Sequence, residues 1–162
     1  GGDPMTPPLT GPLVITSPWG TRVHPVTGET RHHNGVDLRC PQGTPVYAVL
    51  GGYLHGLDLG DGVGGYWVRL VHGAAPGEAL TWSTYCHLSE VDPGLVVPWY
   101  AGVDDGRQRA TYVREGDSIG LSGGSPGTPG AGRSTGPHLH WSIWRGSGSR
   151  ADADPMAWLE GR

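Results

Sequence analysis

The 162-residue chain is long enough to bury one hydrophobic core and too short for two ordinary domains. Its net charge of -4 at pH 7 argues against a nucleic-acid-binding domain, which normally carries a basic stripe. No apolar run approaches the roughly 20 residues that a membrane-spanning helix needs, and no basic segment followed by an apolar one opens the chain. We therefore expect a single domain, monomeric, that binds neither nucleic acid nor membrane.

Glycine and proline punctuate the sequence. Thirty glycines and fifteen prolines separate short apolar runs, which is typical of an all-β protein with many tight turns. No segment before the last eight or so residues shows a 3.6-residue apolar period, so the expected helix is short and lies at residues 154–159. The expected strands, in chain order, are residues 13–16, 44–49, 52–57, 66–72, 79–88, 118–121 and 138–144.

Two stretches, residues 92–112 and 123–136, fit neither a strand nor a helix. Long loops inside a compact domain are often functional, and the walls of a substrate groove are one such use. For residues 92–112, a surface loop without a role is an equally good alternative. We expect the domain to span residues 13–160, after an N-terminal tail at 1–12 whose first four residues look like a cloning remnant.

Eight histidines suggest a metal site, but their spacing carries more information than their number. His138 and His140 are separated by one residue within an expected strand, so their side chains point to the same face, about 6 to 7 Å apart. One imidazole could bind a metal ion while the other reaches a metal-bound water or the substrate.

A second cluster contains His33 and Asp37, which lie four residues apart. The intervening Asn34-Gly35-Val36 is a poor helical sequence. A straight strand would separate His33 from Asp37 by roughly 13 Å, too far for one ion with bonds of about 2 Å. We therefore expect the chain to bend at Gly35, where glycine permits it, and to begin a strand at Asp37.

Two motifs resemble the signature of the LytM and lysostaphin-type zinc endopeptidases: His33-x-Gly35-Val36-Asp37 and Gly136-Pro137-His138-Leu139-His140. The resemblance covers nearly the whole chain in the family's order. It continues through Ser17-Pro18-Trp19-Gly20-x-Arg22-x-His24-Pro25, Gly43-Thr44-Pro45-Val46-x-Ala48, Tyr85-Cys86-His87-Leu88-Ser89 and Gly116-Asp117-x-Ile119-Gly120.

The resemblance implies a LytM/lysostaphin-like antiparallel sheet with little helix and a substrate groove walled by long loops. It implies one zinc ion bound by His33, Asp37 and His140, with His87 and His138 as catalytic histidines that do not bind the metal. Two histidines and one carboxylate leave the fourth tetrahedral position to water, as a catalytic zinc requires. The implied activity is hydrolysis of peptide bonds in the stem or cross-bridge of bacterial peptidoglycan. Which of the two catalytic histidines accepts a proton and which donates one stays open.

Other polar and aromatic residues have simpler interpretations. His32 is an alternative to His33, but only His33 stands where the motif places a ligand. We expect His24 to stabilise a turn or line the groove, and Arg22 to brace that turn beside Asp37 or to bind a substrate carboxylate. We expect His55 and His72 to be ordinary strand or surface residues. For Tyr66 and Trp67 we expect packing in the core or on a sheet face, with groove lining as the alternative.

Cys40 and Cys86 are expected to be free, buried thiols, because two cysteines without C-x-x-C spacing make neither a disulfide framework nor a structural zinc site. Neighbouring residues of a strand point to opposite faces. We therefore expect Cys86 to point into the sheet packing when His87 faces the groove, and not to be a nucleophile.

Two other functions compete with a peptidoglycan endopeptidase: a non-catalytic LytM-like regulator or cell-wall-binding module, and a general protease of soluble proteins. The stretch 92–112 looks longer than usual for the family, which leaves substrate preference open. The bond that is cut could be glycine to glycine, D-alanine to a diamino acid, or another stem linkage. We expect action on the cell wall outside the cytoplasmic membrane, and the lack of a visible signal peptide favours a phage-encoded protein released from the host cytoplasm.

Overall fold

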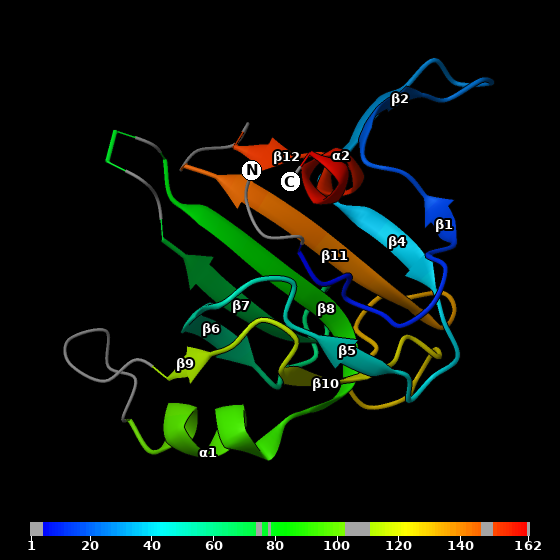
Figure 1. Ribbon diagram of the computed structural model, residues 1–162. Coiled ribbons are helices and arrows are strands. Elements are labelled where there is room, and N and C mark those ends of the chain that lie inside the picture. Colours follow the sequence, from blue (N-terminus) through cyan, green and yellow to red (C-terminus); the bar gives the residue numbers. More distant parts are fainter. Residues whose placement is uncertain (1–4, 74–75, 78, 103–110, 147–150, 162) are drawn as a thin grey trace.

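A computed structural model describes residues 5–73, 76–77, 79–102, 111–146 and 151–161 (Figure 1). The predicted remnant at residues 1–4 lies outside them. The helices and strands, in chain order, are β1 (Ile15–Ser17), β2 (Gly20–Val23), β3 (Thr30–His33), β4 (Val36–Arg39), β5 (Pro45–Tyr47), β6 (Gly52–Asp58), β7 (Tyr66–His72), β8 (Thr81–Val91), α1 (Pro93–Tyr100), β9 (Tyr112–Val113), β10 (Ser118–Ser122), β11 (His138–Arg145), β12 (Asp152–Ala153) and α2 (Pro155–Glu160).

One antiparallel sheet dominates the protein and confirms the predicted all-β class. Its strands follow the order β1, β4, β11, β8, β7, β6 and β9. Strand β12 pairs with β11, and β10 pairs with both β5 and β8. All seven predicted strands are present, within three residues at either end, and α2 lies where the C-terminal helix was expected. Within the described residues, neither helix is long and apolar enough to cross a membrane.

Strand β11 separates the hydrophobic core from the opposite face of the sheet. Leu139, Trp141 and Ile143 are fully buried, while His138 and His140 alternate with them and point to the other side. Burial of each large apolar side chain stabilises the fold by about 1.5–3 kcal/mol. This core therefore fixes the register of β11, because a slip by one residue would exchange the two faces.

The N-terminal segment and strands β5 and β10 cross one face of the main sheet, and the core lies between these layers (Figure 1). Residues 5–12, predicted to be a tail, belong to this covering layer. Met5 and Leu9 are buried in the core, and the backbone N–H of Tyr47 donates to the carbonyl of Pro8 at 2.9 Å.

Helix α1 lies where the sequence pattern predicted only a loop, within residues 92–112. The Asp92 side chain accepts a hydrogen bond from the backbone N–H two residues on, and Pro93 occupies the first turn, so the helix has a normal start. Its sequence is apolar on every side and only Leu95 is buried, which is why no 3.6-residue period marked it. Residues 103–110 of the predicted loop lie outside the described residues.

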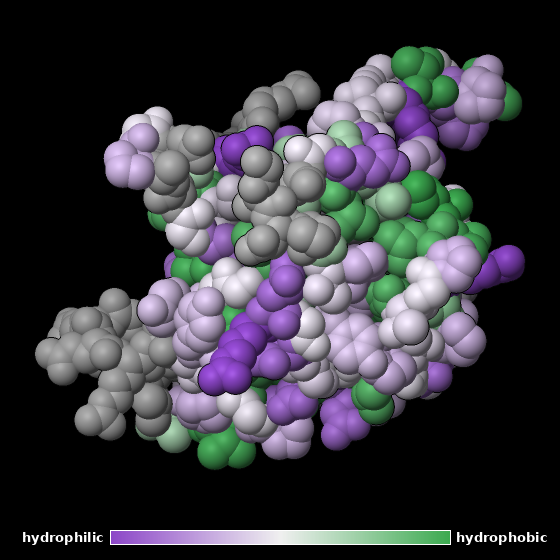
Figure 2. Space-filling view, viewed as in Figure 1, coloured by the Kyte–Doolittle hydropathy of each residue, from purple (hydrophilic) through white to green (hydrophobic). Residues whose placement is uncertain are grey.

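A separate hairpin, formed by β2 and β3, protrudes from the body (Figure 1). Figure 2 shows apolar surface at its tip, where Val23 and Val26 are exposed. The sequence did not predict these two strands. The hairpin ends at His33, so its placement determines where this histidine lies.

Candidate metal centre

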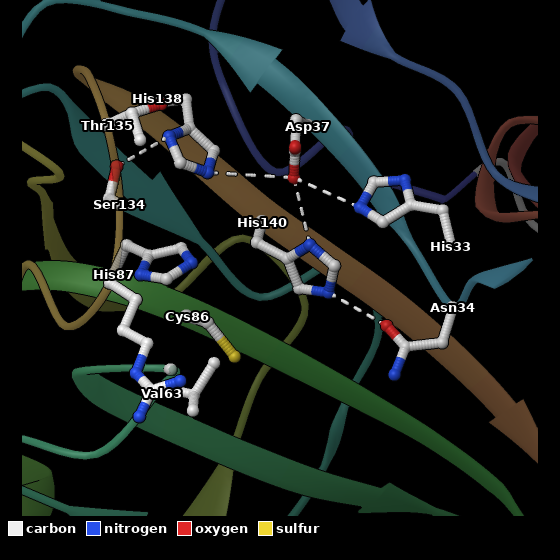
Figure 3. A pocket seen from close by; sticks show the side chains of 12 residues that line it. His33, Asn34, Asp37, Val63, Cys86, His87, Ser134, Thr135, His138 and His140 are labelled. Carbon is white, nitrogen blue, oxygen red and sulfur yellow. Dashed lines mark hydrogen bonds and ion pairs between the residues drawn. The ribbon is translucent and has the colours of Figure 1, made fainter. Parts of the chain in front are cut away.

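A pocket of 460 Å³ on the face opposite the core contains every side chain predicted for the site. Its walls come from the junction of β3 and β4, from strands β8 and β11, and from the loops at residues 63–64 and 133–135 (Figure 3). The second loop belongs to the stretch 123–136, so part of that stretch lines the pocket. The predicted residues that line the pocket are His33, Asp37, His87, His138 and His140.

His33, Asp37 and His140 bring three donor atoms to one point. The Oδ1 atom of Asp37 lies 3.5 Å from His33 Nε2 and 2.9 Å from His140 Nδ1, and one donor atom from each residue lies within 4.8 Å of the others. A tetrahedral zinc ion with bonds of about 2.0–2.2 Å places its ligand atoms roughly 3.3–3.6 Å apart. The donor set therefore fits one zinc ion with a fourth position open.

Strand register explains how residues more than a hundred positions apart meet. In the antiparallel pair of β4 and β11, Asp37 stands directly opposite His140. The chain bends between β3 and β4, as predicted, but the role of Gly35 differs from the prediction. Its φ is not positive; instead, a Cβ atom there would lie 2.5 Å from the carbonyl oxygen of Trp141. Glycine is needed because the turn packs directly on β11.

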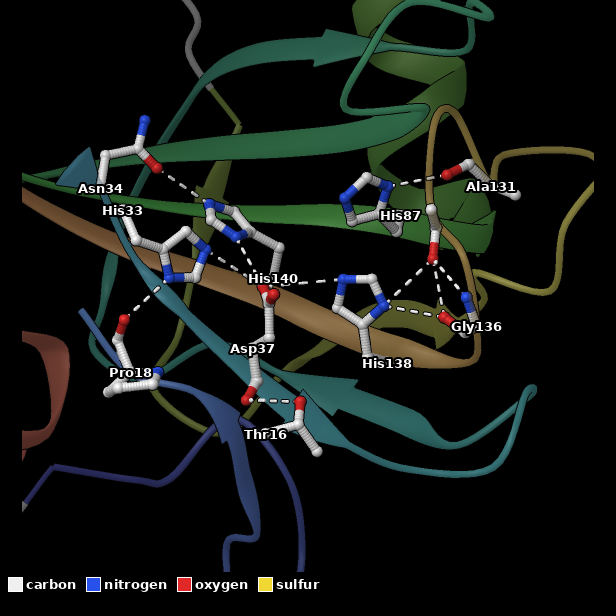
Figure 4. Close-up of polar contacts among 11 residues, drawn as sticks. Thr16, Pro18, His33, Asn34, Asp37, His87, Ala131, Gly136, His138 and His140 are labelled. Atoms are coloured by element: carbon white, nitrogen blue, oxygen red, sulfur yellow. Dashed lines mark hydrogen bonds and ion pairs between the residues drawn. The ribbon is translucent and has the colours of Figure 1, made fainter. Parts of the chain in front are cut away.

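The two histidines of this donor group are held by their outer nitrogens (Figure 4). His33 Nδ1 lies 3.0 Å from the carbonyl oxygen of Pro18, and His140 Nε2 lies 3.1 Å from the amide oxygen of Asn34. Because these oxygens can only accept, the outer nitrogens are the donors in these contacts. The inner nitrogens face the Asp37 carboxylate, and loss of the proton from an inner nitrogen leaves the lone pair that would bind a metal.

Charge in the centre is set by these contacts. Burial raises the pKa of Asp37, but hydrogen bonds from His140 and His33 and the nearby histidine charges outweigh burial and hold this pKa well below its usual value. The hydrogen bond to Asp37 raises the pKa of His33 against the opposing effect of burial. The carboxylate is therefore ionised at neutral pH, and a metal ion would compete with a proton for His33.

His87 and His138 lie beside this donor group, with ring centroids 4.8 Å apart. His87 Nδ1 donates to the carbonyl of Ala131 at 2.8 Å, and His138 Nδ1 donates to that of Gly136 at 2.8 Å. His138 Nε2 lies 3.6 Å from Asp37 Oδ1. The inner Nε2 atoms of both histidines are thus available for proton transfer at the centre.

The backbone of His87 is strained. Its φ of 61° makes it the one non-glycine residue with a positive φ in the described part of the chain, a conformation that costs about 1–3 kcal/mol. A hydrogen bond from its N–H to the carbonyl of Gly64, at 2.8 Å, helps to hold it. Burial, together with the charges of His138 and His140, lowers the pKa of His87 although the Ala131 carbonyl raises it. His87 is therefore neutral at pH 7, as a proton acceptor must be.

The prediction that Cys86 points away from the groove is wrong. Cys86 lines the same pocket as His87, because the left-handed backbone of His87 interrupts the alternation of strand β8. Burial raises the pKa of the Cys86 thiol to about 12, so the nucleophilic thiolate is scarce at neutral pH. Cys40 and Cys86 are both free, as expected.

His32 faces away from the metal centre and anchors the hairpin. Its Nε2 lies 2.5 Å from Asp152 Oδ2, and Trp19 Nε1 donates to the same oxygen at 2.7 Å. Thr21 Oγ1 lies 3.0 Å from His32 Nδ1. No sequence pattern indicated a role for Asp152, because its partners are more than a hundred residues away.

The remaining histidines have structural contacts. His24 Nδ1 accepts the backbone N–H groups of Val26 and Thr27 and so stabilises the hairpin turn. His72 is buried and bonds to Ser83 Oγ at 2.8 Å. His55 packs edge-on against a tryptophan ring, with centroids 4.4 Å apart.

The metal pocket is not lined by Arg22, Tyr66 or Trp67. Arg22 lies exposed on β2, and its charge acts to lower the pKa of His33. Tyr66 lines a neighbouring pocket with residues 127–130, whereas Trp67 packs beneath the guanidinium of Arg69. The described part of the stretch 92–112 contributes no residue to the metal pocket.

Comparison with known proteins places this geometry among peptidases. Residues 31–153 match the family described as Peptidase family M23. The peptidoglycan DD-endopeptidase ShyA of Vibrio cholerae is 35% identical over 132 residues, which cover 75% of this chain and 22% of ShyA. The chain spans about a quarter of the length of the curated relatives it matches.

Two crystal structures share the fold. A zinc-containing peptidase from Vibrio cholerae superposes with a TM-score of 0.66 at 28% identity, over 92% of this chain and 38% of that one. The catalytic domain of the antimicrobial peptidase lysostaphin from Staphylococcus simulans gives a TM-score of 0.62 at 28% identity, over 91% of this chain and 92% of that one. This similarity confirms the predicted lysostaphin-like sheet.

Proposed function

We propose that this chain, which belongs to peptidase family M23, is a zinc-dependent endopeptidase that hydrolyses peptide bonds in bacterial peptidoglycan. The observation that carries the proposal is the His33, Asp37 and His140 donor group with two further imidazoles aimed at it. The peptidoglycan DD-endopeptidase among the relatives supports the substrate class. Its action would be on the cell wall, outside the cytoplasmic membrane.

In this proposal His33, Asp37 and His140 hold the zinc ion. When bound, zinc supplies a water whose pKa is lowered towards about 7 and a Lewis acid that polarises the scissile carbonyl. His87, neutral because burial lowers its pKa, accepts the proton of the attacking water at Nε2. His138 is also held through Nδ1, and in its doubly protonated imidazolium form it donates from Nε2 to the developing oxyanion or to the leaving amine.

A non-catalytic regulator or cell-wall-binding module is the competing function. Such a module needs neither a complete ligand set nor two fixed imidazoles, and this chain has both. The strained backbone of His87 also favours catalysis, because residues with strained backbones cluster at functional sites. We therefore favour catalysis.

Digestion of purified sacculi tests the proposal. The zinc-loaded protein should release soluble muropeptides with new amino termini, and the fragment masses should identify the bond. His140→Ala and chelator-treated protein should release none, and casein should stay intact. Binding of folded, zinc-loaded protein to sacculi without any cleavage would establish the binding module instead.

A further inference from the structure

Arg133 lines the metal pocket beside Val63, Gly64 and His87. Among the described residues that line this pocket, it is the one side chain with a permanent positive charge, and Asp37 is the one carboxylate. The guanidinium of Arg133 makes no hydrogen bond or ion pair with any described residue. Its donors therefore have no partner among the described residues and can bind a group that enters the pocket.

The backbone that carries Arg133 is firmly placed. Its N–H donates to the carbonyl of Val63 at 3.1 Å. The preceding Gly132 has a φ of 60°, and a Cβ atom there would lie 2.5 Å from both the N atom of Gly65 and the carbonyl oxygen of Val63. The loop at residues 63–65 thus packs backbone against backbone on residues 132–133, and this contact fixes the position of the Arg133 backbone.

The same loop also fixes both non-ligand histidines. Ala131, two residues before Arg133, accepts the hydrogen bond of His87. On the other side, Ser134 Oγ lies 3.1 Å from His138 Nδ1. The histidine that protonates the leaving amine must lie close to it, and both candidates are held here. The residue that leaves with the amine is therefore bound at the Arg133 end of the pocket.

We propose that Arg133 binds the carboxylate of the residue that follows the scissile bond. The inference rests on the proposed peptidase function and narrows its substrate. A planar guanidinium pairs with a carboxylate through two parallel hydrogen bonds. A cross-link made on the amine of a diamino dicarboxylic acid has a carboxylate on the carbon next to the leaving nitrogen, and a glycine bridge has none there. The structure thus points to the D-alanyl to diamino acid linkage.

A matched pair of substrates tests this role. Both are D-alanyl-diaminopimelate peptides, and they differ only in whether the carboxyl group beside the scissile bond is free or amidated. The zinc-loaded protein should cleave the free acid with a kcat/KM about tenfold higher, since hydrogen bonds between charged groups are worth at least that factor. Arg133→Ala should lose this preference, because its kcat/KM should fall about tenfold more on the free acid than on the amide.

Two further variants complete the test. Arg133→Lys should keep part of the preference, because it retains the charge and loses the two-pronged geometry. Arg145→Ala, which removes an exposed arginine on β11 outside the pocket, should keep all of it. Equal cleavage of both peptides by the wild type, or an equal loss on both in Arg133→Ala, would overturn the role of Arg133 alone. Failure to cleave either peptide would overturn the peptidase function with it.

Discussion

Each imidazole in the site is bonded on the nitrogen that faces away from the reaction centre. For His33, His87 and His138 the partner is a backbone carbonyl, and for His140 it is the amide oxygen of Asn34. This arrangement selects one tautomer for each neutral ring and orients it before any ligand arrives. The histidines that we propose as ligands and as catalytic residues are thus oriented in the same way, and their positions relative to Asp37 distinguish the proposed roles.

The two non-ligand histidines should therefore be separable from the ligands by mutation. We expect His87→Ala and His138→Ala to retain one equivalent of zinc and the wild-type melting temperature, while kcat falls about 10²- to 10⁴-fold. Metal analysis beside sacculus digestion measures both effects. His55→Ala, on the exposed face of β6, is the control that should change neither. Loss of zinc in either variant would make that histidine a ligand.

The pH profile reports on His87 directly. Burial lowers the pKa of His87 below its ordinary value of 6.5, so the neutral, proton-accepting form persists to lower pH. The kcat/KM should accordingly hold as the pH falls to about 6.5 and decline only below it. The residual activity of His87→Ala should lack this acidic limb. A decline that begins well above pH 6.5 would contradict the assignment of His87 as proton acceptor.

Cys86 lies in the pocket but carries the wrong protonation state for a nucleophile. With the pKa of its thiol raised to about 12 by burial, almost none of it is thiolate at pH 7. We expect Cys86→Ser to keep at least a third of wild-type turnover, and a chelator to abolish it until zinc is restored. Complete inactivity of a folded, zinc-loaded Cys86→Ser protein would favour cysteine chemistry.

At the scale of secondary structure, the sequence predicted the elements that a pattern of apolar residues marks. The long strands β7 and β11 were located almost to the residue because alternating or continuous apolar runs mark them. Helix α1 was missed because its face towards the protein is no more apolar than the others. The side-chain direction of Cys86 was predicted wrongly because one left-handed residue, His87, changes the alternation. Nothing in a linear pattern discloses a positive φ at a non-glycine residue.

The β2–β3 hairpin is the element on which ligand placement depends. The hairpin is anchored by Asp152, which accepts hydrogen bonds from Trp19 and His32. His33 is the next residue after His32, so this anchor also positions His33. We expect Asp152→Ala to loosen the hairpin and weaken zinc affinity about tenfold, the lower end of what lost support of a ligand costs. A competing chelator measures this affinity.

Asp154→Ala is the matched control for Asp152→Ala. Asp154 caps α2 by accepting the N–H of Met156 at 3.0 Å, so its loss should lower the free energy of unfolding by about 1 kcal/mol. Zinc affinity should not change, because the hairpin keeps its anchor. If both variants lost zinc affinity alike, the effect would reflect general destabilisation rather than the hairpin.

At the scale of the whole molecule, the metal centre joins parts of the chain that are far apart in sequence. His33 closes the hairpin, Asp37 lies in β4 and His140 lies in the central strand β11, so a bound ion would connect the protruding hairpin to the middle of the sheet. Ligand binding restricted to the folded state stabilises it by mass action. The ion should therefore contribute to stability as well as to chemistry.

Thermal unfolding with and without zinc measures that contribution. With free zinc at 100 times its dissociation constant, the gain is about 2.7 kcal/mol. For a chain of this size that raises the melting temperature by about 5–10 °C, and a chelator should reverse it. Asp37→Ala removes the central carboxylate and should melt at the same temperature with or without zinc. An equal rise in Asp37→Ala would place the stabilising ion elsewhere, and no rise in the wild type would mean that the three donors do not hold zinc in the folded protein.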